Sequence, residues 1–292
     1  MTDKKIDEVQ IDEVSGVETT GHEWDGIKEL DNPMPRWWLW TFYATIVWAI
    51  AYVIAYPAWP LISSSTAGLT EWSSRGDFWK ENAQIAAERQ GIMDQINAKD
   101  VHEIIADENL RQYAIAGGAA AFRVNCVQCH GTGAQGAPGY PNLNDDDWLW
   151  GGSVDDILTT IRHGVRYTAD DETRVSEMPA FVDVLEPEQI RDVAAYVVSL
   201  SGTPHNPDMI PAGKQVFAEN CAVCHGADAK GLREFGAPNL TDAIWFYGSG
   251  EDAIAKQVAR PKHGVMPAWE ARLGDATVKQ LAIFVHSLGG GE

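Results

Sequence analysis

The four cysteines of this 292-residue chain lie in two short segments of nearly the same sequence. The first segment, NCVQCHGTGAQG, begins at Asn125, and the second, NCAVCHGADAKG, begins at Asn220. Both contain Cys-x-x-Cys-His, the spacing with which proteins attach c-type haem. The two thiols can bond to the two vinyl groups of one porphyrin, while the adjacent imidazole binds the iron. One such segment could also be a zinc or redox pair, but two with the same flanking residues favour haem.

We therefore predict two covalently bound haem c groups, one at each segment. The attachment thiols and iron-binding imidazoles are Cys126, Cys129, His130, Cys221, Cys224 and His225. Further along each copy, Met-Pro-Ala and an aromatic residue follow one another, beginning at Met178 and at Met266. A thioether is a soft, neutral ligand, and a methionine opposite histidine raises the reduction potential of haem iron. We expect Met178 and Met266 to be the second axial ligands.

Two histidines are alternatives for the same iron positions. His163 and His263 each precede Gly-Val at corresponding places in the two copies. Either could ligate iron, which would lower its potential, or could hydrogen-bond to a haem propionate or to the backbone. The most informative difference between the copies is an insert in the first, which carries twelve extra residues, 166–177, before its methionine.

The segments that must position these residues predict an all-α fold. Each copy has a helical pattern before the attachment motif, a loop rich in glycine and proline, a middle helix, the methionine loop and a closing helix. This is the architecture of class I cytochrome c, which we expect at residues 110–202 and again at 203–292. An iron held between histidine and methionine has no open position for oxygen, so each domain would pass single electrons.

One segment near the N-terminus is long and apolar enough to cross a membrane. No charged residue occurs between Arg36 and Glu71, and about 20 apolar residues are needed to cross a hydrocarbon core of ~30 Å. Tryptophans and tyrosines flank the run, and prolines end it. A cleaved signal peptide fits poorly, because an acidic leader precedes the run. We expect a single transmembrane helix within residues 36–60.

The remaining segments are assigned around this helix. Residues 1–35 form an acidic leader that we expect to be disordered to about residue 20. Residues 61–109 read as a linker followed by a helical connector. Haem c is attached on the outer side of the cytoplasmic membrane, which predicts a cytoplasmic N-terminus and periplasmic haem domains. The expected location is therefore the bacterial inner membrane, with membrane lipid around the helix.

The formal net charge of −20 limits the partners. Such a field repels nucleic acid, and we expect no nucleic-acid partner, whereas basic proteins are attracted. Residues 110–202 hold 13 acidic and 6 basic side chains, a net −7, whereas residues 203–292 hold 10 and 8, a net −2. A hypothesis follows in which the first copy receives a basic donor cytochrome near Asp145, Asp146 and Asp147.

The leader and the apolar run together carry a more specific resemblance. The stretch TTGHEWDGIKELDNPMPRWWLWTFYATIVWAIAYVIAYPAWP resembles the N-terminal signature of subunit III of cbb3-type cytochrome c oxidase, a membrane-anchored dihaem subunit. With the two haem domains included, the resemblance covers nearly the whole chain. It implies axial pairs of His130 with Met178 and of His225 with Met266.

The resemblance also implies a route for electrons and a set of partners. The chain would accept electrons from a donor cytochrome c and pass them to the monohaem subunit II. From there they would reach the haem–copper centre of the catalytic subunit, where oxygen is reduced and protons are pumped. No oxygen chemistry would occur on this chain itself, which would be an electron-transfer subunit and not the catalytic one.

Two other functions remain compatible with the haem motifs alone. One is a membrane-anchored dihaem electron carrier that serves a different respiratory complex. The other is a dihaem peroxidase, which needs one iron with a vacant or displaceable ligand. Stoichiometric binding of carbon monoxide at one reduced haem, or turnover of hydrogen peroxide, would favour the peroxidase.

The number of covalent haems follows directly from the motifs. The mature chain should carry two, measured by its mass spectrum together with its pyridine haemochrome spectrum. Replacement of Cys126 or Cys221 by alanine should remove one covalent haem, seen by haem staining of a denaturing gel. Fewer than two tethered porphyrins on the unaltered chain would contradict the assignment.

Overall fold

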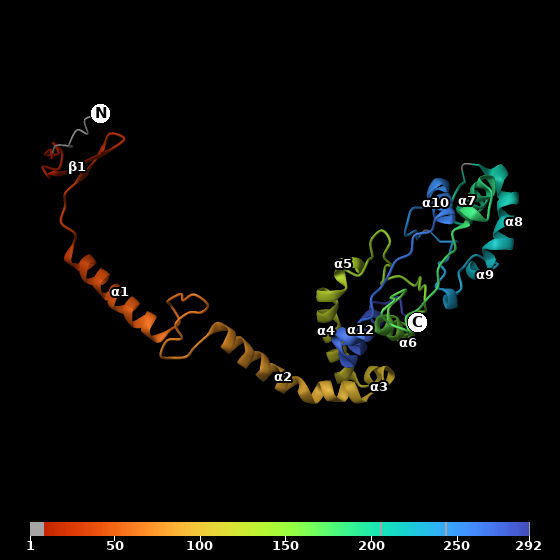
Figure 1. Cartoon of the computed structure of the whole chain (residues 1–292), viewed down its shortest axis with the longest axis horizontal. Coiled ribbons are helices and arrows are strands. Elements are labelled where there is room, and N and C mark those ends of the chain that lie inside the picture. Colours follow the sequence, from red (N-terminus) through yellow and green to blue (C-terminus); the bar gives the residue numbers. More distant parts are fainter. Residues whose placement is uncertain (1–8, 205, 243, 292) are drawn as a thin grey trace. The chain divides into compact units, whose positions relative to one another are not determined.

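The computed structural model describes residues 9–204, 206–242 and 244–291, and these are mostly helical (Figure 1). The chain divides into two compact units, residues 1–87 and 88–292. Each unit is described by itself. The last turns of one helix, α2 (Ser74–Ala98), belong to the second unit.

The leader contains a β-hairpin. Strand β1 (Thr19–Trp24) pairs antiparallel with β2 (Ile27–Leu30). Asp25 and Gly26 connect them with φ of 50° and 86°, which matches the mirror-image turn that an Asp-Gly pair favours in hairpins. The expectation of disorder to about residue 20 is wrong for residues 9–20, because backbone hydrogen bonds order this segment. The amide of Asp12 donates to Val17 at 2.9 Å, that of Thr19 donates to Gln10 at 2.7 Å, and Ile11 forms a bridge with Glu18. Residues 1–8 lie outside the described residues.

The apolar run forms α1 (Arg36–Ala55), a helix of 20 residues with no buried side chain in this chain alone. Such a length can cross the hydrocarbon core of a bilayer. The following loop returns to the end of α1, where the amides of Leu69 and Thr70 donate to the carbonyl oxygens of Ile54 and Ala55, both at 3.0 Å. These bonds satisfy carbonyls that the helix itself leaves without partners. The loop thus closes the end of α1 at the expected membrane boundary.

The second unit contains the helices that surround both attachment motifs. In chain order after α2 they are α3 (Val101–Ala106), α4 (Glu108–Asn125), α5 (Val127–His130), α6 (Val154–His163), α7 (Pro187–Ser201), α8 (Ile210–Asn220), α9 (Ala222–His225), α10 (Glu251–Ala259), α11 (Glu270–Leu273) and α12 (Asp275–His286). Three short 3-10 turns, η1 (Phe181–Asp183), η2 (Pro207–Met209) and η3 (Arg233–Phe235), lie between them.

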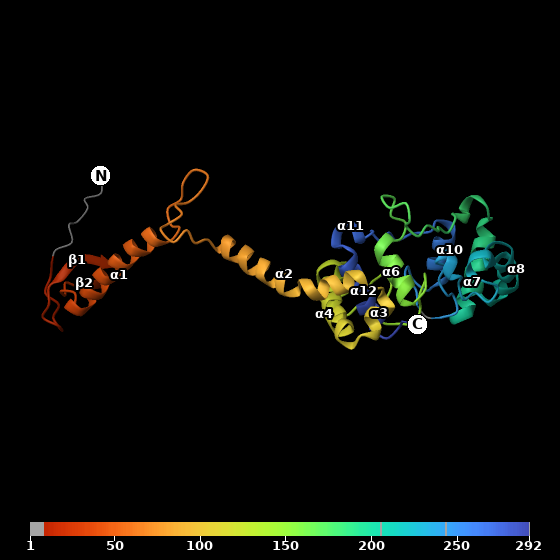
Figure 2. The same cartoon turned by 90° about the horizontal axis from the view of Figure 1, so that it is seen from below.

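The most extensive helix packing runs across the two sequence copies. Helix α12, from the second copy, packs on α4 and α6 of the first, whereas α7, from the first copy, packs on α8 and α10 of the second. Both views show α12 beside α4 and α7 beside α8 (Figures 1 and 2). We call the group of α4, α6 and α12 the first module and the group of α7, α8 and α10 the second module. Each has its own buried core.

Aromatic pairs at the helix crossings have the same geometry in both modules. Phe122 of α4 lies against Phe284 of α12, with ring centroids 5.4 Å apart and planes at 57°. Tyr196 of α7 lies against Phe217 of α8, at 5.3 Å and 57°. The sequence predicted that the first and last helices of each copy would pack on each other, but each packs on a helix of the other copy. Because the two copies offer nearly the same residues at the crossing, the local pattern does not distinguish the two pairings.

A buried lysine attaches the end of α2 to the first module. The Lys279 ammonium on α12 donates to the carbonyl oxygens of Asn97 at 3.1 Å and Lys99 at 2.9 Å, and it pairs with Asp275 at 2.7 Å. Its side chain is buried, so the cation needs these partners. A cation is also favourable at the negative end of a helix. The C-terminal end of α2 is therefore held on the first module by specific hydrogen bonds.

Glycines at the helix crossings give a stability prediction. A Cβ at position 118 would lie 2.2 Å from the carbonyl oxygen of Gln280, and one at position 213 would lie 1.9 Å from that of Asp192. We expect Gly118→Ala and Gly213→Ala each to lower the free energy of unfolding by about 1–3 kcal/mol, through overpacking. Thermal or denaturant unfolding of the haem-loaded chain measures this.

The matched control is Gly91→Ala in α2, where a Cβ would meet no atom within 4 Å. That variant should be unchanged or more stable, by up to ~1 kcal/mol from helix propensity. Equal effects at positions 91 and 118 would contradict the close crossing of α4 with α12.

Candidate haem-binding site

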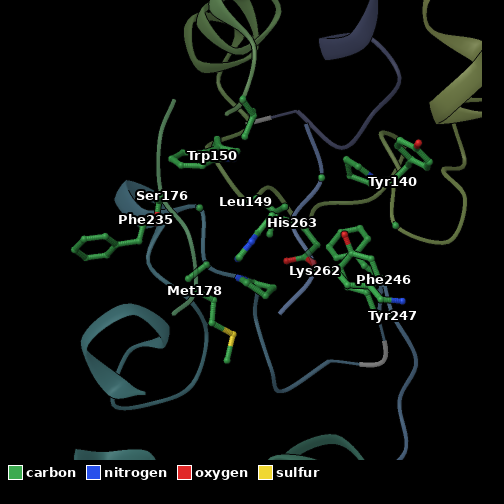
Figure 3. A pocket seen from close by; sticks show the side chains of 18 of the residues that line it. Tyr140, Leu149, Trp150, Ser176, Met178, Phe235, Phe246, Tyr247, Lys262 and His263 are labelled. Atoms are coloured by element: carbon green, nitrogen blue, oxygen red, sulfur yellow. The ribbon is translucent and has the colours of Figure 1, made fainter. Parts of the chain in front are cut away.

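Both attachment motifs line one continuous cavity of about 430 Å³ in the second unit. Its walls come from both modules and are mainly apolar. Figure 3 shows Trp150 and Met178 of the first copy around the same space as Phe235, Tyr247 and His263 of the second. Two prosthetic groups attached at the motifs would therefore share one enclosure, which shortens the path between them.

The attachment residues lie on single helical turns, α5 and α9. In the first, the amide of His130 donates to the carbonyl oxygen of Cys126 at 3.0 Å, and in the second, that of His225 donates to Cys221 at 3.0 Å. Each turn brings two thiols and one imidazole to the cavity wall. The glycine after each histidine has φ near 80°, a left-handed conformation that favours glycine. This explains the glycine that follows both motifs.

The surroundings of the two motif histidines favour neutral imidazoles. The Nδ1 atom of His130 lies 3.0 Å from the carbonyl oxygen of Pro141, and that of His225 lies 3.2 Å from Pro238. Burial lowers the pKa of both imidazoles, and the carbonyl contact opposes this only in part. A neutral ring that donates from Nδ1 keeps its lone pair on Nε2 for a metal. The repeated Pro-Asn-Leu segments thus serve to orient the histidines.

The thiols fit thioether attachment better than a zinc site. Burial, with a smaller contribution from the neighbouring thiol, raises the pKa of Cys126 and of Cys221 to about 11. Thiols with this pKa are protonated at neutral pH when no metal is bound, and a structural zinc site needs four ligands. Among the described residues, no group of three or more His, Cys, Asp and Glu side chains is arranged to hold a metal ion. The donor set therefore fits haem c.

Each methionine packs against the core that holds the attachment motif of the other copy. Met266 packs against the core of the first module, together with Cys126, and Met178 packs against that of the second, together with Cys221. A backbone bridge fixes Met266, since it exchanges hydrogen bonds of 2.9 and 3.0 Å with Val165.

The implied pairing of His130 with Met178 and of His225 with Met266 therefore disagrees with the structure. The chain crosses from one module to the other between the middle helix and the methionine of each copy. Every element after that point, the methionine loop included, is exchanged between the modules.

The two alternative histidines have different surroundings. His163 has both ring nitrogens engaged, with Nδ1 3.2 Å from Asp170 and Nε2 3.1 Å from Glu172. Both carboxylates belong to the twelve extra residues, so His163 orders this insert, and it is not among the residues that line the cavity. His263 lines the shared cavity beside Met178 (Figure 3).

The insert itself holds residues that sequence reasoning missed. Arg166 lines the cavity, and Arg174 pairs with Asp156 at 3.1 Å and lies over the ring of Trp150 at 5.5 Å. Trp150 in turn packs on Gly236 of the second copy, where a Cβ would lie 2.3 Å from the ring. The signal was available as the largest length difference between the copies, which falls at the crossing between modules.

An acidic cluster next to the cavity combines carboxylates of both copies. Burial and the neighbouring Asp242 and Asp145 raise the pKa of Asp147 to about 6. Burial also raises the pKa of Asp145. Asp147 itself lines the cavity. The acidic side chains near this site therefore come from both sequence copies. The net charge of one copy does not say which module carries the acidic surface.

The fold and the site define a membrane-associated c-type cytochrome with two attachment sites. Comparison with known proteins gives the family. A model described as cytochrome c oxidase, cbb3-type, subunit III matches residues 114–197 and 208–285, and one for the N-terminal domain of cytochrome oxidase-cbb3, FixP, matches residues 16–63. The chain belongs to the FixP/CcoP family, the subunit III of cbb3-type cytochrome c oxidases, and is an electron-transfer cytochrome c subunit.

Curated relatives match over nearly their full length. The cbb3-type cytochrome c oxidase subunit FixPc of Rhizobium leguminosarum bv. viciae is 63% identical over 98% of this chain and 100% of its own. FixP of Rhizobium meliloti is 63% identical over 97% of this chain and 98% of its own. CcoP of Cereibacter sphaeroides is 54% identical over 94% and 95%.

The raised pKa of Asp147 predicts how stability changes with pH. The folded chain keeps a proton up to about pH 6 that the unfolded chain releases near 3.8. The free energy of unfolding should therefore fall as pH rises from about 4 to about 6. Asp147→Asn should be more stable than the unaltered chain at pH 7, and the difference should vanish below about pH 4.

Thermal melts across this pH range measure the effect, with Asp183→Asn, an exposed carboxylate on η1, as control. A stabilisation by Asp147→Asn that is the same at pH 4 and pH 7 would show that burial of this charge is not its cause.

Proposed function

We propose that this chain relays electrons from a donor cytochrome c, through one haem c in each module, toward subunit II and the haem–copper catalytic subunit of the oxidase. The observation that supports this most strongly is the single cavity lined by both attachment motifs. Two carriers in one apolar enclosure can exchange electrons without water or a mobile partner between them. The relatives are named as oxidase subunits.

The axial pairs that we propose are His130 with Met266 and His225 with Met178. His225 is buried and His130 is partly buried, and each is oriented by a proline carbonyl. Each methionine packs with the core of the module that holds that histidine. Haem bound in this way supplies a one-electron carrier with a raised potential. With both axial positions filled by side chains, oxygen and peroxide have no iron position to bind, so the peroxidase is disfavoured.

Residues of this chain then keep water away from the two sites. In the first module, Ile157 and Ile161 are buried and line the cavity, and the indole of Trp148 donates to the carbonyl oxygen of Gly290. In the second module, Ile254 and Val258 are the buried counterparts on α10. Exclusion of solvent favours the less charged ferrous state and so contributes to a high potential.

The location that we propose is the bacterial inner membrane, crossed once by α1. The leader hairpin would lie in the cytoplasm and both haem modules in the periplasm. The support is the uncharged stretch from residue 37 to 70, the exposed apolar surface of α1, and the fact that c-type haem is attached outside the cytoplasm. The acidic chain would attract a basic donor cytochrome c to the periplasmic side.

The crossed axial pairs can be tested one haem at a time. In a Cys221→Ala/Cys224→Ala background, only the haem at Cys126 and Cys129 remains. Met266→His should lower the midpoint potential of this haem and abolish its methionine–iron charge-transfer band, because imidazole replaces a thioether. Met178→His in the same background should leave both unchanged. The opposite result would restore pairing within each copy.

The relay itself is tested in the intact complex. The chain should co-purify with a haem–copper subunit, and loss of either haem should stop oxygen reduction by reduced cytochrome c. A chain that purifies without such a subunit, or one whose reduced haem binds carbon monoxide, would favour one of the other two functions.

A further inference from the structure

Arg166 occupies a special position at the crossing between the two modules. It is the first residue of the insert and follows Val165, whose backbone is bonded to Met266. Its Nε donates to the carbonyl oxygen of Gly264 at 2.7 Å, and one of its terminal nitrogens donates to that of Ser176 at 2.8 Å. Ser176 stands two residues before Met178, and Gly264 stands two before Met266. One guanidinium therefore holds both methionine segments.

The positive charge of Arg166 is not neutralised by these contacts. Both acceptors are neutral carbonyls, which occupy two of the five N–H groups of the side chain. Within the described residues, no carboxylate lies at ion-pair distance from Arg166. Burial lowers its pKa, while Glu177 and Tyr247 oppose this only through space. A half-buried cation with spare donors favours an anion at the same place.

The backbone conformation of Arg166 also indicates a functional role. Arg166 has φ of 53°, a left-handed conformation that is rare for a residue with a side chain. Such strain is kept where the surrounding structure fixes it, often at a binding site. Here the amide of Arg166 donates to the carbonyl oxygen of Arg174 at 2.9 Å, which closes the insert onto its own start.

We propose that Arg166 binds a propionate carboxylate of haem in the shared cavity and that its charge raises the reduction potential of both haems. This inference rests on the two haems proposed above. The cavity is lined by Arg166 together with both attachment motifs, and a propionate is an anion that a haem there would bring with it. Planar guanidinium and carboxylate groups match in a two-bonded geometry. Lys262, the other cation on this wall, is exposed and lies 5.9 Å from the ring centroid of Tyr247.

The test compares R166Q, R166K and the control K262Q in the full-length, haem-loaded chain. Haem counts by mass come first, because fewer than two haems in the unaltered chain would overturn the proposed function and, with it, this inference. With two haems present, the measurements below test the role of Arg166 alone. Redox titration then gives both midpoint potentials. R166Q should lower the reduction equilibrium constant of both haems on the order of tenfold, which is ~59 mV for one electron. R166K should lower it less, and K262Q by less than about threefold.

A second measurement separates propionate binding from a purely structural role of Arg166. It is the infrared difference spectrum of the chain with haem labelled by carbon-13 at its propionate carboxyls. The propionate bands should shift in R166Q and R166K and not in K262Q. If R166Q does not mature, R166K decides, since unchanged propionate bands in it would overturn the proposal. Lowered potentials without a shift of these bands would also overturn it, because Arg166 would then act only by holding the methionine segments.

Discussion

The crossing of an entering helix with a closing helix from the other copy is the contact on which both sites depend. Gly118 and Gly213 allow the backbones to approach, and an aromatic pair fills the space beside each of them. Because the closing helices are exchanged, the chain must pass between the modules twice, and both methionine segments lie at those passages. The same packing that builds two cores therefore brings both attachment motifs to one cavity.

Polar groups around that cavity are either fixed in orientation by hydrogen bonds or have a pKa that burial has shifted. The imidazoles of His130 and His225 are fixed by proline carbonyls and kept neutral by burial. Asp147 carries a raised pKa, and Arg166 a lowered one, since burial disfavours their charges. In the proposed function, the protein would thus supply neutral ligands to iron, a mainly apolar enclosure and the cation of Arg166. A one-electron carrier gains its potential from this environment more than from the porphyrin.

Several elements were readable from the sequence because their causes are local. The helices beside the attachment motifs follow from apolar periodicity, and α1 follows from an uncharged stretch. The leader hairpin also has a local cause, since an Asp-Gly pair between short strands is a strong turn signal. The acidic composition of the leader predicted disorder instead. The role of His163 was not local, because its partners Asp170 and Glu172 reach it only when the insert folds back.

The sequence alone determined the chemistry: two Cys-x-x-Cys-His motifs, two methionines in matching contexts, an apolar helix and the family. Spacing along the chain suffices for these, since each attachment motif is a single turn. Only the tertiary structure decided which module each methionine packs with and which backbone carbonyls Arg166 contacts. Two copies with nearly the same crossing residues can pair within or across themselves with similar local packing. The choice is made by the connections and by the insert, whose contacts span about a hundred residues.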